Sequence, residues 1–219
     1  MAVPQRTDAW FARRGLFFTA TEISRLMTKK ISLTRLLDEK TCGVWFGPSS
    51  DAMQWGTDRE EAAVHAFRFS DEFAAYGPGA MLTHDVPGPV SCGVTDGSPF
   101  RWIAADTDAV IHGPASGNIA VVEIKCPYSR DAKEVLSDKM HLIQCHVEQL
   151  CFGVQTAYLV CAVFVDTDDG GSRAELRTRK VPATGLLLAD VAEACQYLSD
   201  HVHPLLRARW RALAALYDV

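Results

Sequence analysis

The chain has 219 residues, a formal net charge of −5, and 48% hydrophobic and 22% charged residues. This composition is typical of a globular protein and excludes a disordered chain. The acidic balance also excludes a protein that coats nucleic acid by bulk charge, although basic groups can still act locally. One domain over residues 1–219 is expected for this length.

Nothing in the chain predicts export or membrane insertion. No apolar run reaches the length of a membrane span, and the first ten residues, MAVPQRTDAW, contain no apolar signal region. The seven cysteines are scattered and form no CxxC pair, which argues against a zinc ribbon or a disulfide framework. We therefore expect an intracellular protein that has no membrane partner.

The first part of the chain predicts helices. A capping-box pattern, T-x-x-E, begins at Thr19, and apolar residues follow it at helical spacing. A short helix is expected over 32–40 and a longer one over 50–69. The candidate core contacts of the longer helix are Met53, Ala63, Ala66 and Phe67.

The next part predicts strands. Alternating or apolar stretches over 100–104 and 108–111 are followed by a strongly apolar stretch over 118–125. The segment 112–118, HGPASGN, is rich in turn-forming residues and predicts a hairpin between the last two strands.

The remaining elements complete a mixed α/β pattern. A helix over 141–152 precedes two strands, over 156–165 and 173–181, that should pair with each other. An amphipathic helix over 190–216 should be interrupted near Pro204, because proline removes a helical hydrogen bond. This order predicts an α/β fold with a central mixed β-sheet flanked by α-helices.

One strand carries a pattern with chemical meaning. Glu123 and Lys125 are two residues apart, so their side chains share a face of the strand, while Ile124 points the other way into the core. If the hairpin forms, Asp108 on the preceding strand lies next to Glu123 on that same face.

Two adjacent carboxylates repel each other and favour a cation between them. Oxygen ligands suit Mg²⁺ or Mn²⁺, and a lysine beside them can orient a water or stabilise charge on a phosphate. The combination predicts a phosphodiester-hydrolysis site. The alternative is an ordinary buried ion pair, in which Glu123 is neutralised by Lys125 or by an arginine.

Four sequence blocks extend this pattern along the chain. They are WFARRG (10–15) with TATE (19–22), WGTDRE (55–60), DTDA (106–109) with EIKCP (123–127), and QCH (144–146). In this order and at these spacings they resemble the lambda-type exonucleases, also called the YqaJ-like viral recombinase family. The resemblance implies the restriction-endonuclease-like core of the PD-(D/E)XK nucleases.

The resemblance implies a role for individual residues. Asp108 and Glu123 would be catalytic metal ligands, Ile124 between Glu123 and Lys125 would complete the metal set, and Lys125 would be the catalytic lysine. Glu60 would lie at the edge of the site and touch a metal through water. The alternative for Glu60 is a solvated carboxylate on a helix.

The family's DNA-phosphate-binding positions correspond to Arg14, Thr21 and Gln144. An arginine fork and a hydroxyl at a helix N-terminus also suit a phosphate on physical grounds. The second glutamine of the family's QxQ motif is replaced by His146, unless the register slips and Gln149 takes its place. A helix histidine is more often structural than a ligand, so His146 is only a possible site residue.

Two further departures concern the aspartate motif. Asp106 and Thr107 stand where the family has Ser-Pro, which places an extra acid at the site, and Ala109 replaces a glycine. Asp106 either points away from the DNA or faces the site, where it would recruit a cation or pair with Arg14. We favour the second arrangement. Asp96 is a rival aspartate that we reject because no strand follows it directly.

These observations predict an Mg²⁺-dependent exodeoxyribonuclease, with Mn²⁺ as a substitute, that digests one strand of linear duplex DNA from an end. The resemblance implies that the digestion runs in the 5′→3′ direction. The resemblance implies viral or phage recombination, double-stranded DNA ends as substrate, a single-strand-annealing partner protein and a homo-oligomeric ring trimer. The protein would be located in the host cytoplasm if it comes from a phage or bacterium, and in the host nucleus or cytoplasm if it comes from a eukaryotic virus. The alternatives are another PD-(D/E)XK nuclease, such as a RecB-like enzyme or an endonuclease, and a catalytically inactive DNA-end-binding subunit.

Overall fold

The fold was analysed in a computed structural model. It describes residues 14–42, 50–84, 86, 90–91, 100–113, 117–128, 131–168 and 170–217. Within these ranges, none of the helices combines the length and the apolar character needed to cross a bilayer.

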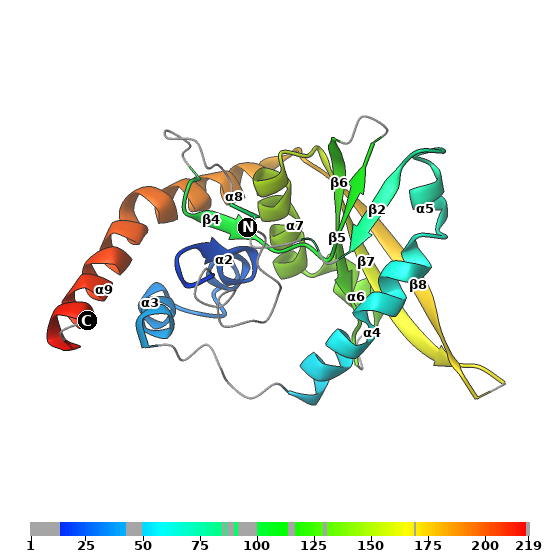
Figure 1. The fold of residues 1–219 in the computed structure, drawn as a ribbon, viewed down its shortest axis with the longest axis horizontal. Helices are drawn as coiled ribbons and strands as arrows, with labels where there is room; N and C mark the ends of the chain where they lie inside the picture. The colour runs from blue at the N-terminus through cyan, green and yellow to red at the C-terminus, as the bar shows by residue number, and fades with distance from the viewer. Residues whose placement is uncertain are drawn as a thin grey trace.

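The central sheet has the order β2-β5-β6-β7-β8. Its strands are β2 (Met81–His84), β5 (Ala109–His112), β6 (Asn118–Lys125), β7 (Thr156–Asp166) and β8 (Ser172–Pro182). Strands β6 and β7 are parallel, whereas the other neighbours are antiparallel. The predicted mixed sheet, the hairpin of β5 with β6, and the pairing of β7 with β8 are therefore confirmed (Figure 1).

A second, smaller sheet has the order β1-β4-β3. It joins β1 (Phe18–Thr19) in parallel to β4 (Ile103–Ala105), which pairs antiparallel with β3 (Val90–Ser91). The strand expected over 100–104 is therefore replaced by the shorter β4, which begins only at Ile103 because residues 100–102 form a turn. The strand expected from Asp108 begins one residue later, so this aspartate lies just outside β5.

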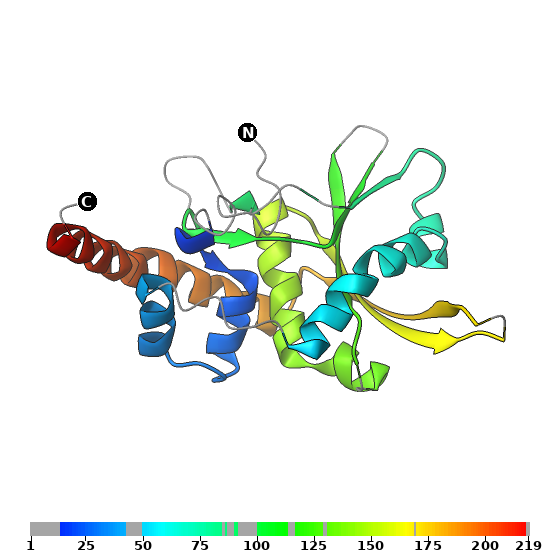
Figure 2. The same cartoon turned by 60° about the horizontal axis from the view of Figure 1, so that its bottom comes forward.

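Helix α7 (Lys139–Phe152) lies between the two sheets (Figures 1 and 2). It contacts β6 and β7 on one side and β4 and α2 on the other. Residues around its whole circumference are buried, which is typical of a central helix. Asp138 caps its N-terminus by accepting a hydrogen bond from the Met140 N–H, and Gly153, at φ 67°, ends it in a left-handed conformation.

Helix α4 (Asp51–Phe67) covers the opposite face of the central sheet. Ala63 and Phe67 are buried against the sheet, as predicted. Met53 is 64% exposed, however, and its predicted core position is wrong. The reason is geometric, since the first turns of α4 extend beyond the sheet (Figure 1). Ala66 is only half-buried.

Two predicted helices form near the start of the chain, α2 (Ala20–Met27) and α3 (Leu33–Cys42). The predicted capping box at Thr19 is present. The backbone N–H of Thr19 donates to Glu22 Oε2 at 2.9 Å. The same carboxylate forms an ion pair of 3.0 Å with the buried Lys40. This buried pair fixes the N-terminus of α2 against α3.

The C-terminal helix is interrupted, as predicted. Helix α8 (Leu186–Tyr197) passes through a π-helical turn (Leu198–Val202) into α9 (His203–Tyr217). The irregular turn ends two residues before Pro204, whose missing N–H cannot take part in a regular ladder. The short helices α5 (Asp71–Ala74) and α6 (Ala132–Ser137) were not expected from the sequence.

Candidate active site

The hairpin of β5 and β6 brings the predicted acidic residues together. Asp108 immediately precedes β5, and its Oδ2 accepts a hydrogen bond of 2.6 Å from the backbone N–H of Ile124 on β6. On the same strand, the ammonium group of Lys125 forms an ion pair with Glu123. Asp108, Glu123 and Lys125 are thus neighbours in the fold.

The alternation of β6 decides which way these side chains face. Val122 and Ile124 pack in the core cluster that contains α4, whereas Val121 packs in the cluster that contains α7. Glu123 and Lys125 share the face of Val121, because strand residues alternate with a period of two. The charged pair therefore lies on the α7 side, and Ile124 points into the core as predicted.

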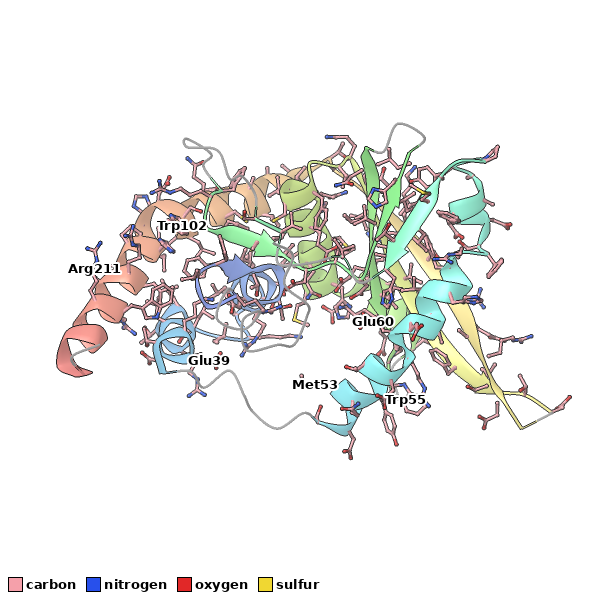
Figure 3. The ribbon with its side chains drawn as sticks, viewed as in Figure 1. Glu39, Met53, Trp55, Glu60, Trp102 and Arg211 are labelled. Atoms are coloured by element: carbon pink, nitrogen blue, oxygen red, sulfur yellow. The ribbon has the colours of Figure 1, made fainter. Side chains whose placement is uncertain are left out.

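A pocket of about 220 Å³ opens at this point. Its lining is Arg14, Thr19, Ala20, Thr21, Glu60, Asp106, Asp108, Glu123, Lys125, Gln144 and Glu148. Glu60 reaches the pocket from α4, and Figure 3 shows it further along this helix than Met53 and Trp55. The fold thus gathers the predicted site residues around one pocket, with two exceptions, Ile124 and His146.

The environment of the pocket disfavours the charged form of the Asp108 carboxyl group. The pKa of Asp108 is raised well above its usual value, first by burial and then by repulsion from Glu123 and Glu60. Burial alone would lower the pKa of Lys125, but the charges of Glu123 and Asp108 outweigh this effect and raise it. Lys125 therefore stays protonated, and the site favours further positive charge.

Glu148 is a site residue that the sequence analysis missed. It is buried on α7, and its Oε2 lies 3.4 Å from the Thr107 hydroxyl, which donates to it. Burial, followed by repulsion from Glu123, raises the pKa of Glu148 well above its usual value. The available signal was its spacing, because Glu148 lies four residues after Gln144 and so shares its helix face.

The donor set fits a hard divalent cation. Glu123 and Asp108 offer carboxylate oxygens, and the only ligand that Ile124 can offer is its backbone carbonyl. Within the described ranges, no three His, Cys, Asp or Glu side chains already converge as a ligand cluster. Mg²⁺ does not need such a cluster, since proteins hold it through one or two carboxylates together with water and substrate phosphates.

The predicted phosphate-binding residues line the same pocket. The guanidinium group of Arg14 donates to Asp106 Oδ2 at 2.6 Å and to the Thr19 hydroxyl at 3.4 Å. Gln144 donates from Nε2 to the Thr21 hydroxyl at 3.1 Å. Asp106 therefore faces the site and pairs with Arg14, the arrangement that we favoured from the sequence.

Gln144 also leaves an acceptor for a ligand. Its Oε1 atom is buried and has no hydrogen-bond partner in the described part of the molecule. A buried acceptor of this kind is costly unless a donor reaches it. A water molecule in the pocket would meet this need.

His146, by contrast, contacts another residue of its own helix and does not line the pocket. Its Nδ1 lies 2.7 Å from Gln149 Oε1, and Gln149 Nε2 donates to the Val181 carbonyl on β8. Neither residue lines the pocket. The geometry therefore gives no support to His146 as a site residue and favours Gln144 over the alternative register at Gln149.

Two parts of the sequence pattern lie outside the described residues. In the block WFARRG (10–15), only Arg14 and Gly15 belong to the described part of the chain. The rejected aspartate, Asp96, lies within residues 92–99, which are also outside it.

Comparison with solved structures shows which fold this is. An alkaline exonuclease (LHK-Exo) from Laribacter hongkongensis matches with a TM-score of 0.70 and 21% identity, over 96% of this chain and 100% of that chain. Its complex with dAMP matches with a TM-score of 0.64 at the same identity and coverage. A phage-related exonuclease from Haemophilus somnus 129PT matches with a TM-score of 0.58 and 11% identity, over 88% and 96% of the two chains. This chain therefore has the α/β fold of the alkaline exonucleases.

Sequence comparison supplies the family. No curated protein sequence matches the chain. The family model of the YqaJ-like viral recombinase domain, by contrast, matches residues 9–159, a stretch that contains the whole candidate site. The chain therefore belongs to the YqaJ-like viral recombinase family.

Proposed function

We propose that the protein is an Mg²⁺-dependent exodeoxyribonuclease that digests one strand of linear duplex DNA in the 5′→3′ direction. The observation that carries this proposal is that one pocket is lined both by Asp108, Glu123 and Lys125 and by Arg14, Thr21 and Gln144. The first group has the chemistry to hydrolyse a phosphodiester, and the second has the donors to hold a terminal phosphate.

The carboxylates have a clear role in this proposal. Asp108 and Glu123 would hold Mg²⁺ together with the carbonyl of Ile124, and Glu60 would contact it through water. Bound Mg²⁺, or Mn²⁺ in its place, would polarise the scissile phosphate and favour hydroxide formation from a bound water. Burial, followed by repulsion from Glu123 and Glu60, raises the pKa of Asp108, and a bound cation would relieve that repulsion.

Lys125 provides a charge next to the reacting phosphate. Its ammonium group stays protonated beside Glu123 and Asp108, so it acts as a donor and not as a base. It can orient the attacking water and stabilise negative charge that develops on the phosphate oxygens. Water forms a new bond to phosphorus, the bond from phosphorus to the 3′ oxygen breaks, and that oxygen leaves with a proton.

The products of this step suit the proposed phosphate-binding residues. Breaking the bond to the 3′ oxygen releases a nucleotide with a 3′-hydroxyl and leaves a new 5′-phosphate on the shortened strand. Arg14 and Thr21 would bind such a phosphate, since a guanidinium group and a hydroxyl make charge-assisted hydrogen bonds to it. Each cycle would therefore regenerate the end that the pocket recognises.

The proposal extends to the context of the activity. We expect the protein to act on double-stranded DNA ends inside the host cell, as a homo-oligomeric ring trimer, in viral or phage recombination. A single-strand-annealing protein would receive the strand that is left. These expectations rest on membership of the family.

The test uses a linear duplex whose two 5′-phosphorylated ends carry different labels, incubated with Mg²⁺ or with a chelator. The expected result is Mg²⁺-dependent release of labelled 5′ mononucleotides and the appearance of single-stranded 3′ tails. Closed circular DNA should resist, and Glu123→Gln should release nothing. Nicking of a supercoiled circle would favour the endonuclease alternative, and DNA-end binding without hydrolysis would favour the inactive subunit.

A further inference from the structure

The catalytic pocket continues into a second and larger groove. This groove has a volume of about 630 Å³ and shares Glu60, Asp108 and Lys125 with the pocket already described. It runs between the N-terminal half of α4, the residues after β6 and the start of α7. The reacting groups therefore stand between a small polar pocket and a larger groove.

The groove has a different chemical character from the pocket. Beyond the three shared residues its lining contains no aspartate, glutamate, lysine or arginine, and includes Met53, Pro127, Tyr128, Val135 and Met140. Met53 and Tyr128 are 64% and 65% exposed. Large apolar side chains that stay exposed beside reacting groups are typical of a binding surface.

Tyr128 packs against Trp55, which in turn contacts Arg59. Its ring makes an edge contact with Trp55 at a centroid distance of 5.2 Å and an interplanar angle of 87°. The guanidinium group of Arg59 lies 3.2 Å from the centre of the Trp55 ring, which supports that indole by a cation–π contact. Because Tyr128 is 65% exposed, much of its side chain is accessible to a ligand.

We propose that this groove binds the nucleobases of the digested strand on the 3′ side of the scissile phosphate, with Tyr128 as the stacking platform beside Met53. The proposal rests on the proposed function and deepens it. The orientation follows from Arg14, which lies in the polar pocket on the other side of Asp108 and Lys125. If the terminal nucleotide occupies the polar pocket, the next nucleotides must pass into the groove.

The chemistry of the groove suits an enzyme that removes any nucleotide. Every base presents a π-face, so stacking on an aromatic ring is tolerant of sequence. Hydrogen-bond readout would require polar groups at fixed positions, and the part of the groove beyond the shared residues is mainly apolar. The groove therefore favours a nucleotide that carries a base but does not distinguish one base from another.

The test combines a protein change with a substrate change. The substrate is a 5′-phosphorylated duplex with an abasic second nucleotide, compared with the intact duplex and with one that is abasic at the opposite position of the complementary strand. Affinity is measured with a chelator present, and the initial rate with Mg²⁺. For the wild type we expect the abasic nucleotide to weaken binding roughly tenfold, the loss of one stacked base.

Tyr128→Ala should bind the intact duplex roughly tenfold more weakly and should be almost insensitive to the abasic nucleotide. Tyr128→Phe keeps the ring and should behave like the wild type, and Met53→Ala should give a smaller loss of the same kind. The matched control is Tyr197→Ala, since Tyr197 is 54% exposed and lies on α8, away from the groove.

The outcomes separate this inference from the proposed function. If the wild type digests the intact duplex but Tyr128→Ala keeps the full sensitivity to the abasic nucleotide, the groove assignment is wrong and the exonuclease proposal stands. If the wild type releases no nucleotide from any duplex, the proposed function fails and the groove assignment fails with it.

Discussion

Arg14 and Asp106 form an ion pair of 2.6 Å in the pocket that also contains Asp108 and Lys125, and their side chains are only 16% and 14% exposed. The guanidinium group that would bind a terminal phosphate is thus already engaged by a carboxylate. A phosphate must compete with Asp106 or bind next to its negative charge, because an ionised carboxylate accepts hydrogen bonds but cannot donate them.

The first prediction concerns this pair. Asp106→Ser removes the competing charge, so Arg14 becomes available and the preference for 5′-phosphorylated over 5′-hydroxyl duplexes should increase. A partly exposed ion pair is worth about 1 kcal/mol, or roughly fivefold in affinity. The measurement is the ratio of initial rates on the two duplexes across an Mg²⁺ titration. Arg14→Ala is the matched control, in which the preference should disappear. An unchanged ratio in Asp106→Ser would place this residue outside substrate binding.

The second prediction links activity to stability at Asp108. Asp108→Asn should abolish turnover, since the amide keeps the shape but loses the ligand charge. It should also raise the free energy of unfolding without metal, because a buried carboxylate repelled by Glu123 and Glu60 is removed. Urea denaturation checks the stability, and Mg²⁺ should stabilise the wild type more than the variant. Loss of the fold in Asp108→Asn would instead favour a structural ion-pair network.

The third prediction separates Lys125 from the metal ligands. Lys125→Ala should lower turnover by about 10²–10³-fold, since it removes a charged donor next to the reacting phosphate. Metal binding should remain, because Asp108 and Glu123 keep their carboxylates. The readout is the shift of the melting temperature with Mg²⁺. A variant that loses this shift would show that Lys125 holds the carboxylates in position and has no separate catalytic part.

The fourth prediction concerns the buried pair behind α2. The side chains of Lys40 and Glu22 are 0% and 1% exposed, and Lys40 also donates to the Phe17 carbonyl at 2.6 Å. Lys40→Met should destabilise the protein by about 3–5 kcal/mol, because it leaves Glu22 without its counter-charge. The double variant Lys40→Met with Glu22→Gln should recover part of that loss. If the single and double variants unfold at the same denaturant concentration, the pair does not interact in this way.

The fifth prediction concerns pH. His203 on α9 stacks on Trp102 at a centroid distance of 3.6 Å, and burial, followed by the charge of Arg207, lowers the pKa of His203 to about 4. An unfolded histidine titrates near pH 6.5. Between about pH 6.5 and pH 4 the unfolded chain therefore binds a proton that the folded chain does not, and stability should fall with the pH by about 1–2 kcal/mol.

His203→Phe provides the control for this pH dependence, because it keeps a ring for stacking but removes the titrating group. Urea denaturation at pH 7.5 and pH 5 should show a smaller difference in the variant than in the wild type. Equal differences in the two proteins would assign the loss of stability to other groups.

Local patterns were enough for several elements of the fold. The apolar run over 118–125 corresponds to β6 residue for residue, and the capping box at Thr19 marks the start of α2. In both cases the information is contained in neighbouring residues, as alternation or as a cap.

Other positions depended on distant contacts. Phe100 to Trp102 have strand-forming side chains but form a turn, and Trp102 stacks on His203 of α9. Met53 has the helical spacing of a core residue, yet it lies at the start of α4, which extends beyond the sheet (Figure 3). Neither outcome can be read from a local pattern, since each depends on where another element packs.

The candidate site shows the same division. By itself the sequence determined that Glu123 and Lys125 share a strand face, because strand alternation is a local property. Only the tertiary structure decided that Glu148 is buried in the same pocket and that Asp106 pairs with Arg14. Those contacts join segments that are remote in the chain, and they form because α7 packs between the two sheets while β4 places Asp106 beside the start of α2.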